Sequence, residues 1–182
     1  MSITRWGCNV LPLVQRPVVC RGVSLYYYCV VGYRDSDWDT MSITTPHQTI
    51  VYGHLNRWRN LQAWGKSLDH VDLTVSNREY PKRAGSCWPE LQKVVVYFQP
   101  GLKGLVGMIK TGLHELAHTV EVADSHGPRW QKVYARAVTE ATGNYVPWGL
   151  GQAQVDEACY KAVLKWWRQS GNEASAKRML GL

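Results

Sequence analysis

The stretch "LKGLVGMIKTGLHELAHTVE", residues 102 to 121, predicts a long buried helix. Its apolar side chains recur every three or four residues, which is the repeat of one helix face. Three glycines interrupt this face, Gly104, Gly107 and Gly112, and each costs a helix roughly 1 kcal/mol relative to alanine. We therefore expect a neighbouring element to pack very closely against this helix.

Both a helix and strands are predicted before this long helix. Thr45 followed by Pro46 is a typical helix start, and the helical spacing of apolar residues continues to Gly65, so a helix is expected over 46–64. Residues 70–76 alternate apolar and polar side chains, and residues 94–98 are an apolar run, so both predict strands. The small residues of 82–88 predict a turn or bulge between strands.

Two further helices are predicted after it. Pro128 opens one, which Gly143 stops. The other covers about 153–169, with Trp166 on its inward side, whereas residues 170–182 are expected to be frayed. Together these elements predict an α+β fold, in which a small sheet packs against the 102–121 helix and additional helices follow at the C-terminus.

The first forty residues differ from the rest of the chain. Residues 1–40 contain no lysine and no acidic residue before Asp35, and "LYYYCVV" (25–31) predicts one short strand. We therefore predict a poorly ordered N-terminal extension over 1–40. A folded domain is expected over 41–147, and a C-terminal helical extension over 148–182.

Composition narrows the classes of protein. No apolar run is long enough to span a bilayer, and the first residues lack the apolar segment of a signal peptide, so no membrane association is expected. The five cysteines include no CxxC pair, which favours reduced thiols in a cytoplasmic protein. We expect this protein to be a monomer. The net charge of +7 favours attraction to phosphate backbones. A basic surface that only keeps the protein soluble explains it equally well.

Two histidines in the central helix suggest a metal site. His114 and His118 lie four residues apart, so both imidazoles share one helix face. Glu115 lies beside them, which completes the HExxH arrangement of zinc peptidases. In such a site zinc lowers the pKa of its water, and we expect Glu115 to act as the general base when that water attacks a peptide bond. The alternative is that these are ordinary polar residues of a helix surface.

Catalytic zinc needs a third protein ligand. His126 is the nearest candidate, because it lies where the chain turns into the next helix. As an alternative, it is a loop histidine that caps the helix starting at Pro128. The rival ligand is Glu140 on that helix, which would make a gluzincin-type site.

Three local patterns together resemble the SprT-like zinc metallopeptidases, the family that includes Spartan. In chain order they are Ala-Gly-x-Cys, HExxH and His-Gly-Pro-x-aromatic, here at Ala84, Gly85 and Cys87, at His114, Glu115 and His118, and at His126, Gly127, Pro128 and Trp130. The resemblance covers about 44–145. The loop between His118 and His126 is shorter than is usual in that family, and no cysteine-rich zinc ribbon follows.

The resemblance implies a zincin-like core that holds one Zn²⁺ per chain through His114, His118 and His126. It implies an endopeptidase whose substrates are proteins associated with DNA or crosslinked to it. Two alternatives stay open: a regulatory gluzincin-like metallopeptidase that cleaves one specific protein independently of DNA, and a non-catalytic DNA-binding module whose zinc is structural.

Support for DNA binding is dispersed along the sequence. Trp167 next to Arg168 could stack on a base and contact a phosphate of single-stranded or sequence-nonspecific DNA. A solvated helix face with Trp166 in the core is the alternative. The candidate DNA contacts are Arg129, Lys132, Lys161, Lys165, Trp167 and Arg168.

Overall fold

The computed structural model describes residues 18–20, 23–25 and 45–182. It separates into two compact units, Met1–Ser42 and Ile43–Leu182. In the first unit, β1 (Val18–Cys20) pairs with β2 (Val23–Leu25) in antiparallel fashion. The expected poor order of 1–40, and the strand expected from Leu25 onward, otherwise lie outside the described residues.

The second unit opens with α1 (Pro46–Arg57). Thr45 caps this helix: its Oγ1 accepts from the backbone N–H of Gln48 at 3.3 Å, and Gln48 Oε1 accepts from the Thr45 N–H at 2.8 Å. The helix ends earlier than the sequence predicted. The chain continues to Gly65 as two single 3-10 turns, η1 (Trp58–Asn60) and η2 (Gln62–Trp64).

Three short strands form one sheet in the order β3-β5-β4. The predicted strands are present as β3 (Asp72–Val75) and β5 (Lys93–Val96), which run parallel and pair Leu73 with Val94. Between them lie β4 (Gly85–Trp88), antiparallel to β5, and a 3-10 turn, η3 (Pro89–Leu91). The turn predicted over 82–88 was therefore partly wrong, because the small residues of this segment form an edge strand.

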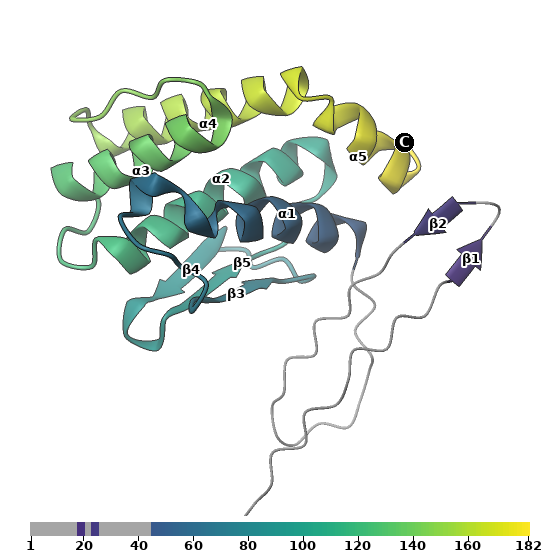
Figure 1. Cartoon of the computed structure of the whole chain (residues 1–182), viewed down its shortest axis with the longest axis horizontal. Coiled ribbons are helices and arrows are strands. Elements are labelled where there is room, and N and C mark those ends of the chain that lie inside the picture. Colours follow the sequence, from purple (N-terminus) through teal and green to yellow (C-terminus); the bar gives the residue numbers. More distant parts are fainter. Residues whose placement is uncertain (1–17, 21–22, 26–44) are drawn as a thin grey trace, which may run out of the picture. The chain divides into compact units, whose positions relative to one another are not determined.

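The long helix is present as α2 (Gly101–Val120), and it packs on β4, β5 and α1 (Figure 1). Its glycines allow close approach, as expected. A Cβ on Gly112 would lie 2.2 Å from Leu55 Cδ1 of α1, and one on Gly107 would lie 2.4 Å from Gln99 Oε1. The glycines thus draw α2 against α1 and the chain that leads into it, which fixes the position of the HExxH turn.

Three more helices complete the unit: α3 (Pro128–Thr142), α4 (Gln152–Gln169) and α5 (Asn172–Leu180). Both α3 and α4 pack on α2 and on each other (Figure 1). The frayed end predicted over 170–182 was wrong, because α5 packs against α4 and α1 and buries Ala176. The fold is α+β, and α4 and α5 belong to the same compact unit as the helix carrying HExxH.

None of the helices in the described part of the chain combines the length and the apolar character that crossing a bilayer requires.

Candidate metal centre

Three imidazoles converge at the C-terminal end of α2. His114 and His118 lie one turn apart on this helix, and His126 reaches them from the loop before α3. The Nε2 atom of His126 lies 3.1 Å from Nε2 of His118 and 3.1 Å from Nε2 of His114. The structure therefore brings all three predicted ligands together, with one ligand atom of each within 4.8 Å of the others.

The spacing of these nitrogens fits a metal better than it fits hydrogen bonding. An imidazole Nε2 carries either one proton or one lone pair, so it makes one strong hydrogen bond. Nε2 of His126 has two nitrogen neighbours at 3.1 Å. Zinc–nitrogen bonds of about 2.0–2.1 Å at tetrahedral angles place the ligand nitrogens roughly 3.3 Å apart. The three side chains thus suit one common metal ion.

The loop before α3 orients His126 towards His114 and His118. Its backbone is left-handed, with a φ of 62°, a conformation uncommon outside glycine. Asp124, rather than His126, caps α3, since its Oδ2 accepts from the Arg129 N–H at 2.7 Å. A Cβ on Gly127 would lie 1.8 Å from Asp124 Oδ1. Glycine at position 127 leaves space for the Asp124 carboxylate that caps α3. The His126 ring is not used for the cap, so it is free to face His114 and His118.

A buried tryptophan lies against all three imidazoles. The ring centroid of Trp130 is 4.6 Å from those of His114 and His126, and it stacks on His118 at 5.0 Å. Burial, together with the charges of His114 and His126, lowers the pKa of His118 to about 4. Burial also lowers the pKa of His126. Both rings are held in the neutral form, which is the form that binds metals.

Glu115 lies beside the histidines, under the edge strand. Burial raises the pKa of its carboxyl, and the positive charges of His114, Lys110 and Arg83 act against this rise. A Cβ on Gly85 of β4 would lie 2.8 Å from Glu115 Cγ. The backbone of β4 therefore passes directly over the carboxylate predicted to be catalytic.

Asp156 of α4 is a site residue that the sequence analysis missed. Its Oδ1 lies 3.4 Å from His114 Nδ1 and 2.5 Å from Lys110 Nζ. Burial would raise the pKa of Asp156, but its contacts with His114 and Lys110 lower it to about 2, so the group is a carboxylate. The only signal in the sequence is an acidic residue between Val155 and Cys159, both of which lie on the apolar side of α4.

Two other residues that could bind a metal, Glu140 and Cys87, do not join the group of three histidines in this structure. Glu140, the rival third ligand, accepts from the backbone N–H groups of Gln62 and Ala63, both at 2.8 Å. Its carboxylate therefore serves the 3-10 turn η2. Cys87 is half-buried, and burial together with the nearby charges of Glu115 and Glu90 raises the pKa of its thiol to about 12. Its thiol therefore stays protonated, whereas the thiolate is the form that binds a metal.

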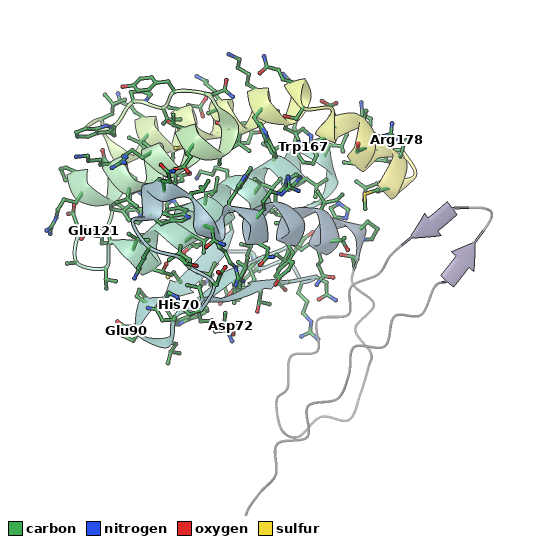
Figure 2. All side chains as sticks on the ribbon, in the orientation of Figure 1. His70, Asp72, Glu90, Glu121, Trp167 and Arg178 are labelled. Carbon is green, nitrogen blue, oxygen red and sulfur yellow. The ribbon has the colours of Figure 1, made fainter. Side chains whose placement is uncertain are left out.

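The predicted nucleic-acid contact at Trp167 is wrong. Its side chain is 1% exposed and points into the body of the protein (Figure 2), so no base can stack on it. Trp166 is only half-buried, with its ring centroid 5.0 Å from that of His54. The buried side of α4 is otherwise the predicted one, because Val155, Cys159 and Val163 are buried, and it extends to Trp167.

The basic candidates lie on two helix surfaces. On α4, Lys161, Lys165 and Arg168 are exposed. Of these, Lys161 pairs with Glu157 at 3.2 Å and Arg168 with Glu173 at 3.9 Å. On α3, Arg129 lies near two acidic groups, and Lys132 sits over the Trp148 ring, 5.2 Å from its centroid. The positive charge available to a polyanion is therefore smaller than the sequence indicates.

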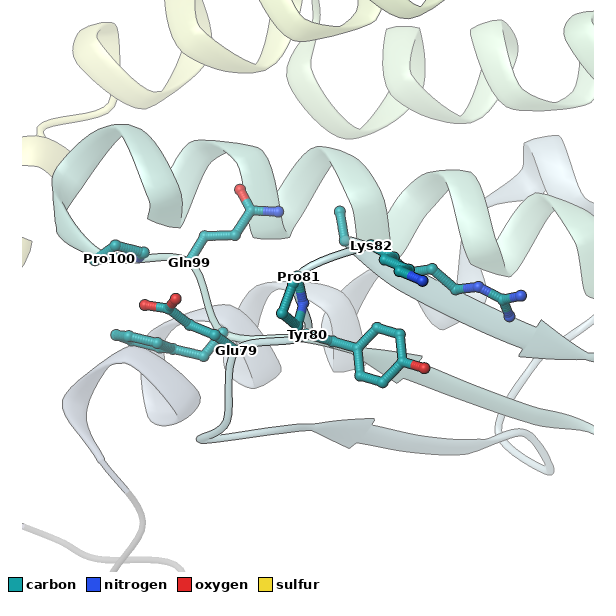
Figure 3. A pocket seen from close by; sticks show the side chains of 9 residues that line it. Glu79, Tyr80, Pro81, Lys82, Gln99 and Pro100 are labelled. Atoms are coloured by element: carbon teal, nitrogen blue, oxygen red, sulfur yellow. The ribbon is translucent and has the colours of Figure 1, made fainter.

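An open hollow of about 400 Å³ lies at the start of β4. Figure 3 shows it between the turn that carries Tyr80 to Lys82 and the chain at Gln99 and Pro100, which leads into α2. Arg83, one of its lining residues, is close enough to Glu115 to influence its pKa. Neither Glu115 nor any of the three histidines lines the hollow.

Comparisons of this chain with protein-family models, with curated proteins and with solved structures found no match. Inference about its function therefore depends on the residues themselves.

Proposed function

We propose that this chain is a zinc-dependent endopeptidase of SprT-like type, with a zincin-like core. The observation that supports this most directly is the convergence of three imidazole nitrogens at 3.1 Å spacing. Glu115 follows the first of these histidines on the same helix. Three histidines with one position left open are a ligand set of catalytic rather than structural zinc.

The residues around the site have complementary roles in this proposal. When bound, zinc would supply Lewis-acid polarisation of a carbonyl and a lowered pKa for its water. Glu115 takes up a proton and then delivers it to the leaving amine. Its raised pKa suits both steps, because a proton carrier works best when its pKa lies near the working pH. Trp130 is buried against the three imidazole rings and shields them from water on the side that it covers.

An edge strand next to Glu115 favours a peptide as the substrate. β4 pairs only with β5 among the described strands, so the backbone groups along its outer edge face outward. An extended peptide can add to such an edge as another strand. Because Gly85 of this strand touches Glu115, a peptide bound there would pass close to the carboxylate.

Replacing Glu115 by glutamine tests this proposal. We expect zinc to stay bound, because Glu115 is not a ligand, while proteolysis falls by roughly 10²- to 10⁴-fold, the usual contribution of a general base. The measurements are bound zinc and cleavage of a DNA-binding protein, with Glu157→Gln on the exposed face of α4 as the matched control. Wild-type protein that retains no zinc, or a variant that cleaves as well as wild type, would refute the proposal. Wild-type protein that retains zinc but cleaves no substrate would instead support a non-catalytic module with structural zinc.

DNA association is the less supported part of the proposal. The net charge of +7 and the exposed Lys161, Lys165 and Arg168 favour it. The same cleavage assay with and without single-stranded DNA decides between substrate classes. Stimulation by DNA, lost at high salt, supports DNA-associated substrates. Cleavage that ignores DNA supports a regulatory peptidase with a specific protein target.

A further inference from the structure

The first ligand of the candidate site has a carboxylate behind it. Nε2 of His114 faces the other imidazoles, so its Nδ1 lies on the opposite side of the ring, 3.4 Å from Asp156 Oδ1. Both atoms are buried, and within the described part of the chain His114 Nδ1 has no hydrogen-bond partner. Two buried polar atoms that face each other in this way are natural partners, because burying either one alone is costly.

Asp156 reaches two side chains that lie one turn apart on α2. Lys110 Nζ is 2.5 Å from the same Oδ1, and the lysine and aspartate side chains are only 20% and 24% exposed. Lys110 therefore neutralises the carboxylate and fixes its position against His114. Asp156 comes from α4, a helix that supplies no metal ligand.

We propose that Asp156 is a positioning residue for the metal centre, an inference that rests on the proposed zinc site. Its carboxylate accepts the Nδ1 proton of His114. That proton fixes the tautomer in which the Nε2 lone pair is free to bind zinc, and it also fixes the orientation of the ring. In this arrangement α4 is a structural part of the metal centre, even though its residues lie beyond the segment that carries the ligands.

A plainer role for Asp156 is to neutralise Lys110, with His114 nearby by chance. The two roles predict different behaviour when Lys110 is removed. If the carboxylate acts on His114, removing it weakens zinc binding whether or not Lys110 is present. If it serves Lys110 alone, removing both side chains together restores zinc binding.

Competition with a chromophoric chelator would measure zinc affinity in the full chain. The variants are Asp156→Asn, Lys110→Met and the double variant. Asp72→Asn, an exposed aspartate paired with Lys93 at 3.7 Å on the sheet, is the matched control (Figure 2). We expect Asp156→Asn to bind zinc about 10- to 100-fold more weakly, the usual effect of losing such a support. The loss should persist in the Lys110→Met background, and the control should equal wild type.

The outcomes separate this inference from the proposed function. If the wild-type protein binds no zinc, both the proposed function and the positioning role of Asp156 are refuted. Wild type that binds zinc, with Asp156→Asn binding equally well or with the loss absent in the Lys110→Met background, overturns the positioning role alone.

A spectrum of the unmodified protein covers the case in which Asp156→Asn does not fold. Histidine ¹⁵N correlation spectra of the zinc-loaded chain should show a protonated Nδ1 on His114, protected from exchange with solvent. An Nδ1 without a proton, or one that exchanges freely, would overturn the inference.

Discussion

Histidine is packed among aromatic rings in two regions of this molecule, and the two regions differ in one respect. His118 lies against Trp130 in the metal centre, and His54 of α1 lies among three tryptophans. In both regions burial lowers the histidine pKa to about 4. The ring centroids of Trp58, Trp166 and Trp167 lie 5.8, 5.0 and 6.0 Å from that of His54.

What distinguishes the two regions is the convergence of ligand atoms, not burial. The Nε2 atom of His118 lies close to ligand nitrogens of two other histidines, His114 and His126. In the described part of the chain, His54 belongs to no group of metal-binding atoms, and its buried Nδ1 has no hydrogen-bond partner. A strongly lowered histidine pKa therefore does not by itself mark a functional site, and a tryptophan cluster produces one equally well.

The largest expected effect follows from removing one histidine of each region. Zinc sites of about 10–16 kcal/mol shared among four ligands give about 2.5–4 kcal/mol per ligand. We therefore expect His118→Ala to weaken zinc binding by roughly a hundred- to a thousandfold, whereas His54→Ala leaves it unchanged. Equilibrium dialysis against zinc measures both. Similar losses in the two variants would mean that the tryptophan cluster is coupled to the metal centre.

A methyl group added in each region gives the next largest effect. A Cβ on Gly85 would lie 2.6 Å from Thr111 Cγ2 and 2.8 Å from Glu115 Cγ, whereas one on Gly53, next to His54, meets nothing within 4 Å. We expect Gly85→Ala to displace Glu115 and to lower the rate of proteolysis by up to about a hundredfold, with zinc retained. Gly53→Ala should leave the rate unchanged. Equal rates in the two variants would show that Glu115 tolerates displacement.

The smallest expected effect is a dependence of stability on pH that comes from His54. Its pKa is about 4 in the folded chain and 6.5 in the unfolded one, so the unfolded chain binds more protons between these values. The contribution of neutral His54 is fully present above pH 6.5 and is lost as the pH falls towards 4. We expect about 2 kcal/mol, after allowance for partial exposure.

Urea unfolding of the metal-free protein at several pH values, compared with His54→Asn, measures this contribution. The other histidines are the same in both proteins, so the difference between the two stability curves isolates His54. Parallel stability curves for the two proteins would contradict the assigned pKa of His54.

Much of the fold could be predicted because its signals are local. Thr45 with Pro46, and Pro128 with Gly143, mark helix ends through backbone preferences that neighbouring residues set. The strand β4 was missed because Gly85, Ser86 and Cys87 lack the large alternating side chains of a typical strand. It forms because β5 and α2 supply its partners, which no short stretch of sequence reveals.

The residues of the candidate site also divide into those that local sequence predicts and those that only packing brings together. His114, Glu115 and His118 could be predicted, since one turn of helix fixes their relation. His126 could be proposed from its place in a turn, but its left-handed backbone and the cap that Asp124 supplies depend on packing. Asp156 could not be predicted, because only the docking of α4 on α2 brings it to His114.

The contact of Trp130 with all three imidazoles also provides an optical reporter. An indole ring whose centroid lies 4.6 to 5.0 Å from each candidate ligand is near enough for an open-shell ion in the site to quench its emission. The chain has nine tryptophans, so a Trp130→Phe variant would isolate this share of the fluorescence. Loading with Co²⁺ could then be followed in real time, with no added dye and before any substrate is known.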